Sequence, residues 1–157
     1  MIKTYEALLK QILIDIQSTL NKRMKEINDA IYQGTKTGPT LTLSSASRYS
    51  FHTPQDRGTG SEYKGLIVFD LAMLEETSIP IIAHDSVLLK QIQDTALEGI
   101  LTHYSKQEKQ VFIALYKNST YSSTSQALLK KAEVLRLSPN GGELYSWAWN
   151  NVLEDTV

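Results

Sequence analysis

The sequence contains no cysteine, which excludes disulfide bonds, thiolate metal sites and a cysteine nucleophile. It has no apolar run approaching the roughly 20 residues that a membrane-spanning helix needs. Near the N-terminus, Lys3, Glu6 and Asp15 interrupt the apolar positions, so the continuous apolar core of a signal peptide is missing as well. A soluble, cytoplasmic protein without a membrane partner is the expectation.

An excess of charge of either sign is also missing. The 16 Lys and Arg residues against 17 Asp and Glu residues give a formal net charge of −1. This balance provides no electrostatic argument for binding DNA, so any DNA contact would have to come from other parts of a larger assembly. With 157 residues and 41% hydrophobic content, the chain can form one domain with a core and one appendage.

Residues 1–33 predict one long amphipathic helix, because apolar residues recur every three or four positions and the first glycine is Gly34. Those apolar positions are Ile2, Tyr5, Leu9, Ile12, Ile16, Leu20, Met24, Ile27 and Ile31. The helix could lie on its own domain's sheet or form the end of a coiled-coil arm, and the pattern fits both. After the breaker-rich connection that follows, residues 39–157 are expected to form the main lobe.

The pattern of the main lobe predicts an α/β fold, with a small mixed sheet flanked by helices. Residues 40–43 and 48–51 alternate polar and apolar around a serine-rich turn, which predicts a hairpin. The apolar runs 79–83 and 111–115 predict neighbouring, buried central strands, joined by a helix over residues 87–104.

The last part of the chain predicts a short helix and a terminal hairpin. The helix is expected over residues 126–133. Residues 134–137 and 144–149 flank the turn sequence SPNGG, which predicts that they pair as strands.

The sequence GTGSE, residues 58–62, precedes a helical pattern that begins at Glu62. The N-terminus of a helix presents unbonded N–H groups and a positive dipole end, so Thr59, Gly60 and Ser61 form a candidate anion cradle that we expect to lie outside the core. The same residue types are also ordinary helix caps.

Asp85 follows the apolar run 79–83, and a carboxylate at the end of such a strand lies where α/β sheets place ligands and metals. It could instead cap the helix that follows. For His84, beside it, we expect a packed or hydrogen-bonded side chain rather than a metal ligand, since no second histidine stands at ligand spacing.

Together these motifs resemble the C-terminal lobe of an ABC-type ATPase head of the SMC and RecN kind, and in particular poorly characterised bacterial SMC-like ATPases. In that family the signature loop reads roughly L-S-G-G-[EQ], so the resemblance places Thr59, Gly60, Ser61 and Glu62 at its last four positions. It likewise implies that Asp85 is the magnesium-side carboxylate of a Walker B strand.

The resemblance implies a nucleotide-dependent assembly. ATP and Mg²⁺ would bind only in an assembled head, with a Walker A-bearing N-terminal lobe and a second head as partners. The signature loop would then meet ATP held on that opposing head, and the two heads would close on it.

Two departures from the family pattern put hydrolysis by this chain in doubt: Ser86 stands where the catalytic glutamate is expected, and no histidine follows the strand predicted over residues 110–116, where many family members sense the γ-phosphate. The largest departure is that no P-loop of the form GxxxxGK[ST] occurs. The alternative reading is a self-contained, non-enzymatic interaction module that binds a partner through its N-terminal helix.

Overall fold

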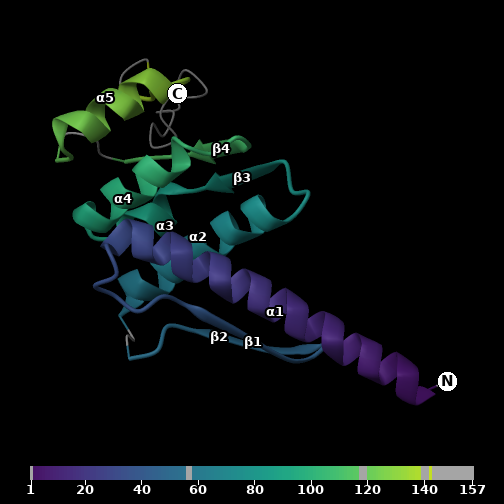
Figure 1. Cartoon of the computed structure of the whole chain (residues 1–157). Helices are drawn as coiled ribbons and strands as arrows, with labels where there is room; N and C mark the ends of the chain where they lie inside the picture. The colour runs from purple at the N-terminus through teal and green to yellow at the C-terminus, as the bar shows by residue number, and fades with distance from the viewer. Residues whose placement is uncertain (1, 56–57, 117–119, 139–141, 143–157) are drawn as a thin grey trace, which may run out of the picture.

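The computed structural model describes residues 2–55, 58–116, 120–138 and 142 (Figure 1). Its helices and strands follow in the order α1 Ile2–Tyr32, β1 Thr40–Ser45, β2 Arg48–His52, α2 Thr59–Glu76, β3 Ile81–His84, α3 Ser86–Lys90, α4 Asp94–Tyr104, β4 Gln110–Ile113 and α5 Ser123–Ala132. The predicted α/β fold, with a long first helix and small sheets flanked by helices, is confirmed.

Helix α1 has two halves with different surroundings. Its second half packs on α2 and α4 and contributes four buried side chains to the core: Leu20, Met24, Ile27 and Ile31. Its N-terminal end extends beyond the tip of the β1–β2 hairpin (Figure 1), and Tyr5, Leu8, Ile12 and Ile16 in its first half are exposed. The apolar stripe therefore continues beyond the part of the helix that the domain covers.

Strands β1 and β2 form the predicted hairpin, in antiparallel register with Leu41 opposite Phe51. Two side chains of α1 take the place of a neighbouring strand along β1. The Asn21 amide donates to the Leu41 carbonyl and accepts from its N–H, both at 2.8 Å, and Gln17 accepts from the Leu43 N–H at 2.8 Å. These bonds satisfy the backbone of β1 and fix the hairpin to α1.

Strands β3 and β4 pair in parallel, with Ile82 opposite Val111, so the predicted pairing is confirmed. The expectation that both strands are fully buried is wrong. One face, with Ile82 and Val111, packs against the core, whereas Ile81 and Phe112 on the other face are 41% and 44% exposed. Within the described residues this sheet has two strands, and the exposure of these two side chains shows that its second face is only partly covered.

The predicted helix over residues 87–104 is divided in two. Helix α3 ends at Lys90 and α4 begins at Asp94, with Gln93 as its extended N-cap. The break redirects the chain and lets both Leu89 and Ile92 enter the core. Periodicity alone did not show it, because apolar residues continue through the break at helical spacing.

The C-terminal predictions are met only in part. Helix α5 begins three residues earlier than expected, because Ser122 caps it by accepting from the Ser125 N–H. Residues 134–137 do not form a strand; the described pairing there is one bridge between Ser138 and Gly142. Residues 144–149 lie outside the described residues.

Helix α5 is held to α4 through one carboxylate. Glu98 accepts hydrogen bonds from the Ser122 N–H at 2.8 Å, from the Ser122 hydroxyl and from the Ser125 hydroxyl at 2.9 Å. These bonds lower the pKa of Glu98 below its ordinary value, with the Ser122 hydroxyl as the largest cause. The contact is thus strongest when Glu98 is ionised.

This contact predicts an acid-sensitive α5. Because the folded pKa of Glu98 is lowered, its stabilisation is present above the ordinary value of 4.5 and is lost as pH falls through the folded value. We expect the protection of the Gln126 amide against hydrogen exchange to fall at low pH in the wild type. Glu98→Gln should already show the lower protection at pH 7, whereas the exposed control Glu108→Gln should match the wild type. Equal behaviour of the two variants would contradict this account.

Candidate functional site

The loop predicted to bind an anion lies in the first turn of α2, which begins at Thr59 rather than at Glu62. Gly58 is the N-cap, with φ −72° and ψ 139°, and as a glycine it has no side chain with which to cap the helix. Its carbonyl accepts from the N–H groups of Ser61 (2.9 Å) and Glu62 (3.1 Å). Among the described residues, the N–H groups of Thr59 and Gly60 have no hydrogen-bond partner. The first turn therefore presents two available donors.

The exposure of this turn is uneven. Thr59 and Glu62 are exposed, whereas Gly60 and Ser61 are half-buried. A Cβ atom at Gly60 would lie 2.6 Å from the carbonyl oxygen of Gln91, the residue that directly follows α3. The loop is not part of the hydrophobic core, as expected, but the backbone at Gly60 is in contact with the end of α3. Any side chain at this position would push the two elements apart.

Asp85 lies directly after β3 and caps α3, which is one of the two roles that the sequence predicted for it. Its Oδ1 accepts from the Ser86 N–H at 2.6 Å and from the Ser86 hydroxyl at 3.2 Å. Within the part of the chain that the structure describes, no three His, Cys, Asp or Glu side chains gather as a metal site requires. Mg²⁺ often takes one or two carboxylates together with substrate phosphates, so Asp85 fits as a single ligand beside bound nucleotide and not as a site of its own.

His84 is a buried, hydrogen-bonded histidine, as predicted, with a side chain only 3% exposed. Its Nδ1 lies 2.5 Å from the Tyr104 hydroxyl of α4, and its Nε2 lies 3.0 Å from Asp70 Oδ2 of α2. Burial, and then the charge of Asp70, raise the pKa of Tyr104, so its hydroxyl remains protonated. No local pattern around His84 indicates these two partners, which lie 14 and 20 residues away in the sequence.

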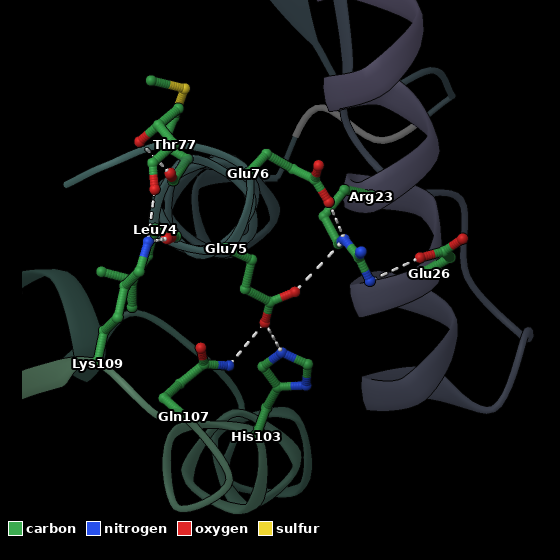
Figure 2. A network of polar contacts seen from close by, with 10 residues as sticks. Arg23, Glu26, Leu74, Glu75, Glu76, Thr77, His103, Gln107 and Lys109 are labelled. Carbon is green, nitrogen blue, oxygen red and sulfur yellow. Dashed lines mark hydrogen bonds and ion pairs between the residues drawn. The ribbon is translucent and has the colours of Figure 1, made fainter. Parts of the chain in front are cut away.

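The opposite end of α2 is held by a second polar network (Figure 2). Glu75 accepts from His103 Nε2 at 2.8 Å and from Gln107 Nε2 at 2.6 Å. Arg23 of α1 binds Glu76 at 2.6 Å and lies 3.5 Å from Glu75. The pKa of Arg23 is raised above its ordinary value, mainly by the hydrogen bond to Glu76. Helices α1, α2 and α4 thus meet at these two glutamates.

Lys109, directly before β4, completes this end of α2. Its ammonium donates to the carbonyls of Leu74 and Thr77, each at 2.5 Å (Figure 2). A cation at this position satisfies the last carbonyls of the helix and complements its dipole.

Near the other end of α2, Lys64 is almost fully buried, at 1% exposure. Its ammonium lies 3.2 Å from Asn28 Oδ1, 3.4 Å from the Thr37 carbonyl and 4.9 Å from the centre of the Tyr32 ring. Lys64 therefore joins α2 to the end of α1 and to the connection that follows it.

Comparisons with solved structures agree with the α/β arrangement. One similar structure is described as "Structural biochemistry of ATP-driven dimerization and DNA stimulated activation of SMC ATPases", with a TM-score of 0.61, 12% identity and coverage of 85% of this chain and 84% of that chain. Another is described as "Crystal structure of the SmcHead bound to the C-winged helix domain of ScpA", with a TM-score of 0.55 and 14% identity. That alignment covers 76% of this chain and 39% of the other. The fold is thus similar to that of SMC ATPase heads.

The sequence comparisons give a family without a described activity. No curated protein matches the chain. Among the described residues, no helix is both long and apolar enough to cross a membrane. A family model described as "Uncharacterised protein conserved in bacteria (DUF2326)" matches residues 27–149. Because this match spans most of the sequence, the chain belongs to the DUF2326 family.

Proposed function

We propose that this chain is the C-terminal half of an SMC-like ATPase head and offers its α2 N-terminus to ATP held on an opposing head. Thr59, Gly60 and Ser61 would face the γ-phosphate, with Glu62 beside them. Asp85 would supply one carboxylate ligand to the Mg²⁺ ion that accompanies the nucleotide bound in its own head. The output is nucleotide-dependent closure of two heads, for which positioning and charge stabilisation suffice.

The observation that carries this proposal is that two N–H groups in the first turn of α2 have no partner among the described residues, in a fold similar to that of SMC heads. A purely structural helix end gains stability when its donors are satisfied, yet the N–H groups of Thr59 and Gly60 have no partner among the described residues. An anion would satisfy both and would also interact favourably with the helix dipole.

The open face of the β3–β4 sheet supports the idea of an incomplete head. Ile81 and Phe112 expose more than two fifths of their surface there, which is unusual for central strands of an α/β layer. A Walker A-bearing lobe that extends or covers this sheet would bury both side chains. That lobe is also required for ATP binding, because the chain has no P-loop.

A second function, binding of a helical partner through α1, is favoured by the exposed stripe on its first half. Tyr5, Ile12 and Ile16 lie 68%, 44% and 44% exposed at heptad-like spacing. A partner helix on this stripe is compatible with both an ATPase arm and an independent interaction module. A substitution on this stripe that removes binding of the helical partner but leaves ATP-dependent association intact would assign the two functions to separate surfaces.

For the isolated chain we expect no ATP turnover above a buffer control, because it has no P-loop and Ser86 replaces the expected glutamate. The measurement is phosphate release with Mg²⁺ and ATP, with Ser86→Ala as a parallel sample. Turnover that disappears in Ser86→Ala would contradict the proposal and indicate a different chemistry.

The positive test of the function is ATP-dependent association. The chain is mixed with a Walker A-bearing lobe, sought first in the coding DNA directly upstream, and the mass of the complex is followed by analytical ultracentrifugation. Association of two heads with ATP and Mg²⁺, but not without nucleotide, is the expected result; association that ignores nucleotide would overturn the proposal.

A further inference from the structure

The segment that carries Asp85, residues 84–91, contacts α2 at both of its ends. At its start, His84 Nε2 lies 3.0 Å from Asp70. At its end, the Gln91 carbonyl lies so close to Gly60 that a Cβ atom there would be 2.6 Å away. Asp70 and Gly60 are ten residues apart on one helix, which corresponds to about 15 Å along its axis. Helix α2 thus spans the whole segment and holds it at two points.

The first of these contacts is a directional hydrogen-bond chain. An ionised Asp70 can only accept, so His84 Nε2 carries a proton and donates to it; in the neutral imidazole, Nδ1 then accepts from the Tyr104 hydroxyl. Each of the three groups therefore has a defined role, and the imidazole is fixed in one orientation. Since His84 is 5% and Tyr104 is 8% exposed, water cannot easily replace the bond between these two residues, whereas the side chain of Asp70 is 42% exposed.

The second contact is a close approach of backbone to backbone. It needs glycine at position 60, and it links the candidate anion loop to the C-terminal end of α3. Helix α3 has only five residues, and Asp85 caps its other end. The carbonyl of Asp85 accepts from the N–H groups of Leu88 at 3.2 Å and Leu89 at 3.3 Å, so a displacement of α3 would be transmitted to Asp85.

We propose that His84 is a positioning residue which, with Asp70 and Tyr104, fixes Asp85 relative to α2, so that the anion loop and Asp85 form one coupled unit. This inference rests on the proposed function and adds regulation to it. An anion that engages Thr59–Ser61 from an opposing head would then stabilise the geometry of Asp85 in the chain's own head. Communication between the two nucleotide positions would run through α2, His84 and α3.

Amide hydrogen exchange of the intact, isolated chain, followed by NMR, tests the coupling without any ligand. Asp70→Leu and Tyr104→Phe each remove one hydrogen bond of the chain, whereas Asp70→Asn keeps an oxygen that can accept from Nε2. Loss of one such bond should increase exchange about tenfold at Leu88 and Leu89, which report on Asp85, and also at Ser61 and Glu62, which report on the loop. Asp70→Asn should stay close to the wild type at all four amides.

The amides of Leu41 and Leu43, which donate to Asn21 and Gln17 of α1, serve as an internal reference for general loosening. Unchanged exchange there, with faster exchange at both reporter pairs, is the expected pattern. Faster exchange at every amide would mean that the chain of bonds is merely structural, and a response at Leu88 and Leu89 without one at Glu62 would mean that the loop is not coupled. Either result, or no response at all, overturns the inference.

Failure of this inference and failure of the proposed function are distinguishable. The exchange experiment needs no nucleotide and no partner, whereas the proposed function is tested by ATP-dependent association. Association with wild-type chain in the absence of coupled exchange would retain the function and remove the role of His84.

Discussion

Replacing Thr59 with arginine is expected to abolish ATP-dependent association of this chain with a Walker A-bearing head. Thr59 is exposed at the first position of α2, and its N–H is one of the two available donors. A long side chain there would obstruct the approach of a phosphate to the helix N-terminus. We expect a loss of affinity of at least about 100-fold, comparable to removal of several charge-assisted hydrogen bonds. The dissociation constant is measured by analytical ultracentrifugation with ATP and Mg²⁺.

Two further variants control this experiment. Thr59→Ser keeps a small hydroxyl side chain and should associate like the wild type. Thr42→Arg makes the same exchange at an exposed position of β1, so it tests the effect of one added charge alone. If Thr59→Arg associates as well as Thr42→Arg, the loop does not serve ATP in trans. Gly60 is unsuitable for the test, because any side chain there would disturb the contact with Gln91.

Ile27→Ala is expected to destabilise the fold by about 2–5 kcal/mol, because it leaves a cavity between α1, α2 and α4. Ile27 is 1% exposed and belongs to the core. Ile14→Ala is the matched control on the same helix; Ile14 is 49% exposed, so its loss should change stability by no more than about 0.5 kcal/mol. Urea unfolding monitored by circular dichroism gives both values. Equal effects of the two substitutions would contradict the placement of the second half of α1 in the core.

The elements that the sequence predicted well are those with a strong local pattern. Helix α1 follows from a stripe of apolar residues at helical spacing, and the β1–β2 hairpin follows from two alternating runs around a serine-rich turn. The parallel pairing of β3 with β4 follows from two short apolar runs separated by a crossover. In each case, neighbouring residues carry the information.

The features that the sequence did not predict depend on contacts between distant residues. Nothing near His84 indicates Asp70 or Tyr104 as partners, and nothing in GTGSE indicates that Gly60 touches Gln91. The exposed face of β3 and β4 was likewise missed, because an apolar run shows that a surface needs covering and not what covers it.

The candidate site could be predicted at the level of its motifs only. Asp85 was expected at the end of a strand, either as a metal-side carboxylate or as a helix cap. The structure shows it as the cap of α3. The position of the loop at a helix N-terminus was also predicted, although the helix begins at Thr59 and not at Glu62. Their linkage through α3 and His84 could be seen only in three dimensions.

The proposal that this chain is half of an ATPase head and meets ATP held on another head is tested most directly by photo-crosslinking. The probe is an ATP analogue that carries its reactive group on the γ-phosphate. The chain is incubated with a Walker A-bearing lobe, Mg²⁺ and the analogue, and the labelled peptide is identified by mass spectrometry. The account predicts label on the peptide that contains Thr59–Ser61, only when the other lobe is present, and strongly reduced label in Thr59→Arg. Label confined to the other lobe under conditions in which the heads associate, or equal labelling of the wild type and Thr59→Arg, would contradict it.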